Sequence, residues 1–230
     1  MLGPKGWCAL EIIGHRANSG RIAIFYSMVG IKAVEVDVSL KSGKPMALHG
    51  RPSVRRATPI GRLWGWIDYK LFYRDPLYKP MPLANWLERL WSMGFTKVVI
   101  DVKSGGIDPT LLASEVERGW PGQVIYTSEN HRYLRRLREE ASAVVYTTYS
   151  ILPVDVADPA LKAGAEGVSI RFDLAIEDNV IRALRQSGLK VVVWTVNTED
   201  QAKTVEKLGV DAIVSDRPDK VLRALDKREK

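Results

Sequence analysis

Eight short apolar runs rich in Val and Ile recur along this chain, and amphipathic stretches separate them. The runs are Ala9–Ile13, Val34–Val38, Val98–Val102, Val124–Tyr126, Ala143–Tyr146, Gly167–Ile170, Val191–Thr195 and Ala212–Val214. Continuous runs of this length are typical of strands that are buried on both faces of a parallel sheet. From the third run onward, successive runs begin 19 to 26 residues apart, which leaves room for one helix between strands. The pattern predicts a (β/α)₈ TIM barrel, with a doubly wound open sheet as the structural alternative.

Helical periodicity appears between the runs. Leu83–Met93 has apolar residues at helical spacing, and Gly94 follows as a possible C-cap. The same pattern occurs in Pro109–Arg118, Glu129–Glu140, Glu177–Gln186, Thr198–Leu208 and the segment from Arg217 to the C-terminus. Gly188 and Gly209 stand where two of these helices are expected to end.

The interval between the second and third runs is longer than the others. Val38–His49 has the pattern of a hairpin with its turn at Ser42-Gly43. Residues 50–80 then form an insertion with six aromatic residues and seven basic residues against two acidic ones. We expect residues 1–230 to form a single barrel domain and the insertion to cap the barrel mouth, as a folded plug, a grip for a lipid chain or a contact with an anionic membrane surface.

Composition excludes several classes of protein. The single cysteine, Cys8, rules out an intrachain disulfide and a Cys-rich zinc site. The 34 Lys and Arg residues against 27 Asp and Glu give a net charge of +7, which permits an anionic partner. No nucleic-acid-binding signature accompanies that charge, so we expect no nucleic-acid partner. Without a signal-peptide pattern or a long apolar span, we expect a cytoplasmic protein. The oligomeric state is left open.

Three acidic residues are predicted to meet where two neighbouring strands end. Glu35 and Asp37 are two residues apart and therefore leave the same face of a strand. Asp101 ends the next run, and Lys103 follows at the same spacing. Buried carboxylates need a cation. All-oxygen ligation suits one divalent ion, Mg²⁺ or Ca²⁺ with Mn²⁺ also possible, whereas the alternative is an ion-pair cluster with Arg16 and Lys103.

Two of the three histidines fall near these acids. His15 follows the first run, and the hairpin returns His49 towards the second. Such a pair can serve as general acid and general base, although each could also be an ordinary hydrogen-bonded histidine at a strand end. Arg16 and Lys103 could hold an anionic phosphoryl group. His131 is expected on the surface.

Five segments in order resemble the glycerophosphodiester phosphodiesterase family. They are Ile13–Arg16, Val34–Val38, Ser42–His49, Gly188–Asn197 and Leu208–Pro218. The resemblance covers nearly the whole chain and implies a (β/α)₈ barrel that hydrolyses glycerophosphodiesters to glycerol phosphate and an alcohol, with a divalent metal. By position it implies His15 and His49 as the catalytic acid and base, Glu35, Asp37 and Asp101 as metal ligands, Arg16 and Lys103 as phosphate contacts, and Trp194 as part of the substrate pocket.

The sequence departs from the family pattern at three places. Asp101 stands where the family usually has Glu, Gly50 and Arg51 follow the second histidine in place of an acidic residue, and a Pro-Glu-Asn-Thr-like stretch is missing after His15. These differences concern the substrate more than the reaction class. They leave open a lysophospholipase D or a lyase on the same barrel. A non-catalytic barrel that binds anionic ligands is the remaining alternative.

Overall fold

The computed structural model describes residues 10–50, 70–71, 75–104 and 106–226. The chain divides into two compact units. The terminal unit comprises Met1–His15 and Thr127–Lys230, and the central unit comprises Arg16–Tyr126. Most of the predicted insertion, including residues 51–69 and 72–74, lies outside the described residues.

The central unit contains a four-stranded sheet with the order β5-β2-β3-β4. Its elements are α1 (Gly20–Val29), β2 (Ala33–Lys41), β3 (Lys44–Ala47), β4 (Met81–Pro82), α3 (Leu83–Ser92), β5 (Lys97–Val102) and α4 (Pro109–Gly119). Strands β2 and β5 are parallel, whereas β2 and β3 form the predicted antiparallel hairpin. The turn residues Ser42 and Gly43 both have positive φ, as a two-residue hairpin turn that matches the strand twist requires.

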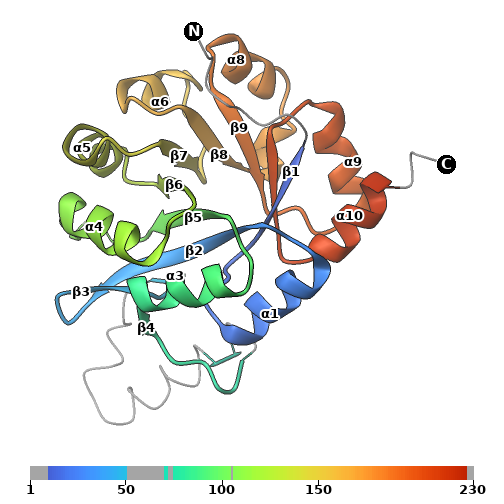
Figure 1. The fold of residues 1–230 in the computed structure, drawn as a ribbon. Coiled ribbons are helices and arrows are strands. Elements are labelled where there is room, and N and C mark those ends of the chain that lie inside the picture. The colour runs from blue at the N-terminus through green and yellow to red at the C-terminus, as the bar shows by residue number, and fades with distance from the viewer. Residues whose placement is uncertain (1–9, 51–69, 72–74, 105, 227–230) are drawn as a thin grey trace, which may run out of the picture. The chain divides into compact units, whose positions relative to one another are not determined.

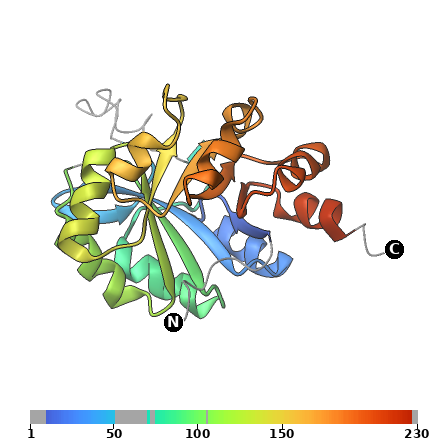
Figure 2. The ribbon, with the colours of Figure 1, turned by 90° about the horizontal axis from the view of Figure 1, so that it is seen from above.

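Strand β6 (Gln123–Ser128) leads from the central unit into the terminal unit. There, β1 (Glu11–Gly14), β7 (Val145–Tyr149), β8 (Gly167–Arg171), β9 (Lys190–Trp194) and β10 (Ala212–Ser215) form a parallel sheet with the order β7-β8-β9-β10-β1. The helices of this unit are α5 (His131–Ala141), α6 (Asp158–Lys162), α7 (Phe172–Ala175), α8 (Val180–Gln186), α9 (Glu199–Lys207) and α10 (Pro218–Asp226). Figures 1 and 2 show α5, α6, α8 and α9 on one side of the strands that they connect.

The strands carry the core of each unit. Val34, Val36 and Ile100 are fully buried in the central unit, as are Val191 and Val193 in the terminal unit. Within the described residues, eight strands (β1, β2 and β5 to β10) are each followed by at least one helix, which is the (β/α)₈ arrangement that the sequence predicts. No helix in the described ranges combines the length and the apolar character needed to cross a membrane.

Several element boundaries differ from the prediction. The helix predicted over Glu129–Glu140 begins at His131, because Asn130 is its N-cap and accepts a hydrogen bond from the Tyr133 amide. The helix predicted from Glu177 begins only at Val180, since Asn179 has a left-handed backbone conformation. Met93, rather than Gly94, is the C-cap of α3, and Gly94 follows with positive φ.

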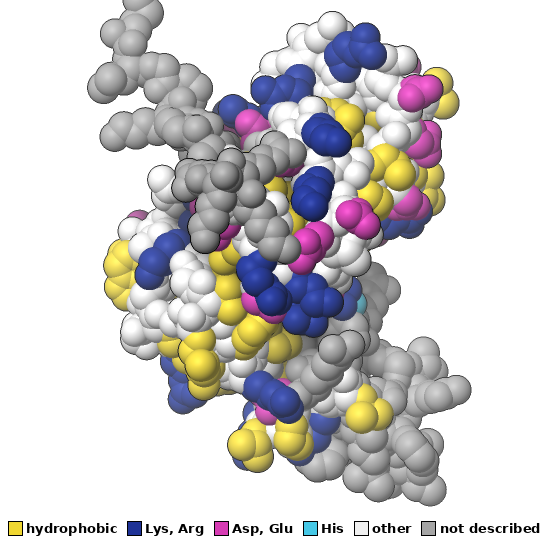
Figure 3. All heavy atoms as spheres, turned by 90° about the vertical axis from the view of Figure 1, so that its right-hand side faces the viewer, with side chains coloured by type: hydrophobic (Ala, Val, Ile, Leu, Met, Phe, Trp, Pro, Cys, Tyr) yellow, Lys and Arg dark blue, Asp and Glu magenta, His cyan; other side chains and the backbone are white. Residues whose placement is uncertain are grey.

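The surface seen in Figure 3 has mixed charge. Lys and Arg side chains (dark blue) are spread among acidic ones (magenta) on that face. On α10, Asp219 pairs with Arg217 at 2.8 Å and with Arg223 at 3.1 Å. Exposed ion pairs of this kind contribute little to the free energy of unfolding.

Candidate active site

The three predicted acids come together near the point where the parallel pairing of β2 with β5 ends. The parallel register places Asp37 beside Asp101, and Glu35 lies two residues earlier on β2. One carboxylate oxygen from each of these three residues lies within 4.8 Å of the other two. Glu35 and Asp37 are 5% and 1% exposed. Two of the three carboxylates are therefore shielded from water, and the Asp101 side chain is 13% exposed.

Lys103 is a cation that contacts two acids of this cluster. Its Nζ lies 3.3 Å from Asp37 Oδ1 and donates a hydrogen bond to Asp101 Oδ2. Burial lowers the pKa of Lys103, but the attraction of Asp101, Asp37 and Glu35 outweighs burial, so its pKa is raised above the usual range. Lys103 is therefore positively charged at neutral pH.

The surroundings of Glu35 disfavour its charged form. Burial raises the pKa of Glu35 well above its usual value, and repulsion from Asp37 and Asp101 raises it further, against the opposing effects of Lys103 and the Arg16 amide. Ionisation of all three acids is costly unless another cation is present.

The hairpin delivers His49 to the same cluster, as predicted. After β3 the Leu48 amide donates to the Asp37 carbonyl at 2.9 Å, which fixes the backbone beside β2. His49 Nδ1 consequently lies 3.0 Å from Asp37 Oδ2. Nearby, Tyr78 packs against Leu48 and its hydroxyl donates to the Ala47 carbonyl at 3.1 Å, so the end of the insertion is anchored to the hairpin.

The segment Arg16–Asn18 binds β2 through its backbone and one amide side chain. Arg16 has positive φ, and its amide donates to Glu35 Oε2 at 2.7 Å. Asn18 Nδ2 donates to the Asp37 carbonyl at 2.8 Å, and Asn18 Oδ1 accepts from the Asp37 amide at 3.1 Å. Asn18 was not predicted as a site residue. It holds the backbone of Asp37 and so positions one of the acids.

In the terminal unit, His15 follows β1 and contacts a carboxylate that the sequence analysis did not single out. His15 Nδ1 lies 2.8 Å from Asp216 Oδ1. Asn197 Nδ2 donates to Asp216 Oδ2 at 2.9 Å. Asp216 and Asn197 both fall in segments on which the family resemblance rests, which is the signal that could have identified them. Trp194, at the end of β9, is partly buried.

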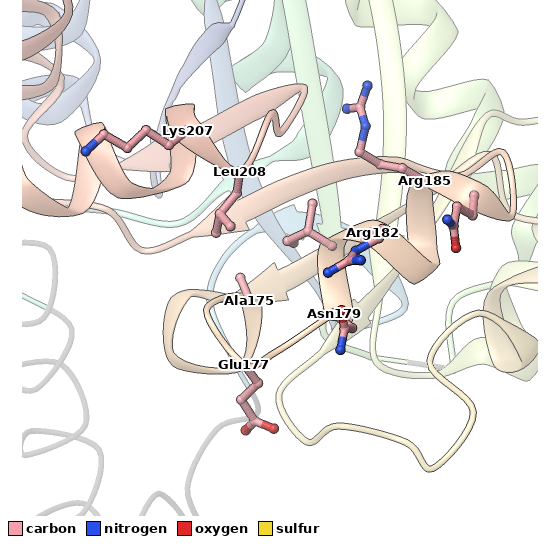
Figure 4. Close-up of a pocket in the computed structure, with 9 residues that line it drawn as sticks. Ala175, Glu177, Asn179, Arg182, Arg185, Lys207 and Leu208 are labelled. Atoms are coloured by element: carbon pink, nitrogen blue, oxygen red, sulfur yellow. The ribbon is translucent and has the colours of Figure 1, made fainter.

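The terminal unit also contains a pocket that none of the predicted site residues lines. It has a volume of about 480 Å³ and lies between the α7–α8 segment and the end of α9. Its labelled residues in Figure 4 include Arg182, Arg185, Lys207 and Glu177. The pocket lies on helices rather than at the carboxyl ends of strands, where (β/α)₈ enzymes place their active sites.

The acidic cluster fits a hard divalent cation. Two buried carboxylates and one partly buried carboxylate supply oxygen ligands only, and their oxygens are close enough to share one ion. Mg²⁺, Ca²⁺ and Mn²⁺ favour oxygen donors of this type, whereas the cluster has no thiolate. A divalent charge would also relieve the repulsion that raises the pKa of Glu35.

A comparison with known protein families shows which family the chain belongs to. A family model described as the glycerophosphoryl diester phosphodiesterase family matches residues 15–220. The chain belongs to this family. The match includes every residue predicted for the site, from His15 to Trp194.

Two curated relatives illustrate the similarity in sequence. A glycerophosphodiester phosphodiesterase from Caldanaerobacter subterraneus is 27% identical over 56% of the chain and 56% of its own length. One from Arabidopsis thaliana is 27% identical over 82% of the chain and 62% of its own length. The chain thus spans less than two thirds of either relative.

A solved structure shows the same fold. The Oleispira antarctica phosphodiesterase, in complex with the product sn-glycerol-3-phosphate, matches with a TM-score of 0.74 at 22% identity, over 94% of this chain and 96% of that one. This match confirms the predicted (β/α)₈ barrel.

Proposed function

We propose that the protein is a metal-dependent phosphoric diester hydrolase that cleaves glycerophosphodiesters to glycerol phosphate and an alcohol. The observation that carries this proposal is the convergence of Glu35, Asp37 and Asp101, with His49 and Lys103 in contact with them, in a chain of the glycerophosphoryl diester phosphodiesterase family. The product complex of the Oleispira antarctica phosphodiesterase supports glycerol phosphate as the product class.

Glu35, Asp37 and Asp101 would hold one divalent cation, Mg²⁺ or Ca²⁺ with Mn²⁺ as a further possibility. When bound, such an ion polarises a phosphoryl oxygen and stabilises the negative charge that develops in the reaction. The chain positions the three acids by the β2–β5 register and by the bonds of Arg16 and Asn18 to β2. Lys103 keeps one positive charge beside Asp37 and Asp101.

His15 and His49 would transfer protons to and from the diester. In each histidine Nδ1 lies against a carboxylate, of Asp216 and Asp37 respectively. The opposite ring nitrogen, Nε2, is then the atom for proton transfer. One histidine would take the proton from the attacking hydroxyl or water, and the other would protonate the leaving alkoxide.

Three further residues complete the proposed site. Arg16 and Lys103 would bind the phosphate oxygens, because both carry positive charge and guanidinium groups pair well with phosphate. Trp194 would line the pocket for the glycerol moiety or the leaving group. A role in phospholipid catabolism follows from this substrate class. A lid or membrane contact by residues 50–80 stays a prediction.

The direct test is release of glycerol phosphate from glycerophosphocholine and glycerophosphoglycerol, with Mg²⁺, with Ca²⁺ and after chelation with EDTA. We expect hydrolysis with one of the two metals and none after chelation. His15→Ala and His49→Ala should each lower turnover by roughly 10²–10⁴-fold. His131→Ala is the matched control, since His131 packs against the Tyr149 ring and has no role in the proposal.

The outcomes separate the alternatives. Full turnover after thorough chelation would exclude the metal, and full activity in both histidine variants would exclude the acid and base assignment. Cleavage of lysophospholipids without hydrolysis of the glycerophosphodiesters would indicate the lysophospholipase D or lyase instead. Binding of these compounds without turnover would indicate a non-catalytic barrel.

A further inference from the structure

His15 is held by a network that lies within the terminal unit. Its backbone amide donates to the Ser215 carbonyl at 2.9 Å, which aligns the end of β1 with the end of β10. Its side chain is 10% exposed, and Nδ1 meets Asp216 Oδ1 at 2.8 Å. A carboxylate accepts and does not donate hydrogen bonds, so this contact favours the ring form with its proton on Nδ1.

Asn197 in turn fixes Asp216. Asn197 Oδ1 accepts hydrogen bonds from the Asp216 amide at 2.8 Å and from the Ser215 hydroxyl at 3.2 Å, while its Nδ2 donates to Asp216 Oδ2 at 2.9 Å. Because its oxygen accepts from a backbone amide, the amide group of Asn197 cannot be flipped without losing these bonds. The backbone N–H of Asn197 donates to Gln201 Oε1 at 2.9 Å, which ties this segment to the start of α9. Both oxygens of Asp216 therefore have defined partners.

We propose that Asp216, braced by Asn197, is a positioning residue that fixes the tautomer and ring orientation of His15. This inference rests on the proposed function, in which His15 transfers a proton through Nε2. The carboxylate keeps the proton on Nδ1 and compensates the charge of the imidazolium that forms during turnover. Asp216 acts through His15 and is assigned no contact with substrate or metal.

The tautomer of His15 can be read directly by NMR, because the chain has only three histidines. Long-range ¹H–¹⁵N spectra of protein labelled with ¹⁵N-histidine give one ring pattern for each, and His15→Gln and His131→Gln assign them. We expect wild-type His15 in its neutral form to carry the proton on Nδ1. In Asp216→Ala, His15 should exchange between the two tautomers, and Asn197→Ala should change it in the same direction by a smaller amount.

Kinetics supply the second measurement. Asp216→Ala should lower kcat by roughly 10–100-fold while KM changes little, since the loss concerns proton transfer rather than binding. Asn197→Ala keeps the carboxylate and covers the case in which Asp216→Ala fails to fold. Asp219→Ala is the matched control, because Asp219 pairs with the exposed side chains of Arg217 and Arg223, and it should leave both the tautomer and kcat unchanged.

The two measurements distinguish failure of this inference from failure of the proposed function. A wild-type His15 with its proton on Nε2, or an Asp216→Ala protein with unchanged tautomer and kcat, overturns the positioning role even if the enzyme hydrolyses glycerophosphodiesters. A wild-type protein without phosphodiesterase activity, whose His15 still responds to Asp216→Ala, removes the proposed function and leaves the positioning of the ring supported.

Discussion

Asp37, within β2, and Asp211, directly before β10, are both buried aspartates, but their charged neighbours differ. Asp211 precedes β10, and its carboxylate accepts from the Val191 amide at 2.8 Å, from Lys190 Nζ at 3.0 Å and from Arg185 Nη1 at 3.4 Å. One carboxylate there has two cations and one amide. Asp37 instead shares Lys103 with Asp101, while Glu35 adds a third acid.

The comparison sets a carboxylate that has two cationic partners of its own against one that shares its lysine with a second acid. Asp211 is neutralised by its own neighbours and ties α8, β9 and β10 together at the amino ends of the strands. The acidic cluster lies toward the carboxyl end of β5, where its parallel pairing with β2 ends. There, burial raises the pKa of Glu35, and repulsion from Asp37 and Asp101 raises it further. In (β/α)₈ barrels, residues at the amino ends of the strands serve stability, and residues at the carboxyl ends serve catalysis.

The largest expected effect is on activity. Asp37→Asn should lower kcat/KM for a glycerophosphodiester by roughly 10³-fold or more, because loss of metal ligation forfeits several kcal/mol of transition-state stabilisation and each 1.4 kcal/mol is a factor of ten. Asp211→Asn, the same substitution at the carboxylate that pairs with Lys190 and Arg185, should retain kcat/KM near the wild-type value. Steady-state assays at saturating Mg²⁺ or Ca²⁺ measure both. An equal loss of activity in the two variants would contradict the distinction.

The next effect is on stability. Asp211→Ala should lower the free energy of unfolding by about 2–3 kcal/mol, because the buried Val191 amide loses its acceptor and two cations lose their counter-charge. The side chains of Lys190 and Arg185 are 40% and 48% exposed, so water replaces part of what they lose. Urea unfolding followed by circular dichroism gives the value. A loss below that of an ordinary surface substitution would show that Asp211 has no structural role.

A smaller effect should appear in the pH dependence of the metal-free protein. Because the pKa of Glu35 is raised on folding, the folded chain binds this proton more tightly than the unfolded chain, and stability falls as pH rises above the ordinary carboxyl value. In EDTA at pH 7, Glu35→Gln should therefore be more stable than the wild type by roughly 1–2 kcal/mol, and the difference should disappear at acid pH, where Glu35 is protonated in both states.

Addition of a divalent metal sharpens the same test. Mg²⁺ or Ca²⁺ should stabilise the wild type against thermal unfolding and should stabilise Glu35→Gln much less, since a neutral amide replaces one ligand charge. Asp211→Asn should keep the full response to metal. A Glu35→Gln protein that is less stable than the wild type at pH 7 in EDTA would show that neither burial of the Glu35 charge nor its repulsion by Asp37 and Asp101 dominates the energy of the site.

The strand pattern and the acid pair could be predicted because both depend on short-range periodicity. Glu35 and Asp37 share a face through the two-residue period of a strand, and the Ser42-Gly43 turn indicates the hairpin that returns His49. Asn18 and Asp216 could not be predicted in this way. Each acts through hydrogen bonds between segments that are distant in sequence, and no local spacing indicates such a pair.

Helix α1 illustrates a different limit. Its sequence contains Ile, Phe, Tyr and Val, which are favoured in strands, and charged residues that would show a solvent-facing side are missing after Arg21. The helix forms because Ser19 caps its start and because its buried residues Ala23 and Tyr26 pack in the core. Tertiary packing thus decides a segment whose local preference is ambiguous.

The smallest expected effect tests how strongly Asp211 depends on Arg185, one of its two cationic partners. Arg185 is about half exposed, lies 3.4 Å from Asp211 Oδ2 and also lines the pocket in Figure 4. Arg185→Ala should lower the free energy of unfolding by less than about 1 kcal/mol, because Lys190 and the Val191 amide still neutralise Asp211 and exposed ion pairs contribute little. Urea midpoints with an unchanged m-value measure this difference. A loss as large as that of Asp211→Ala would mean that the Asp211 carboxylate depends on Arg185 alone. The surroundings of Asp211 and Asp37 would then differ in how many partners stabilise each carboxylate, and not in the ratio of cations to acids.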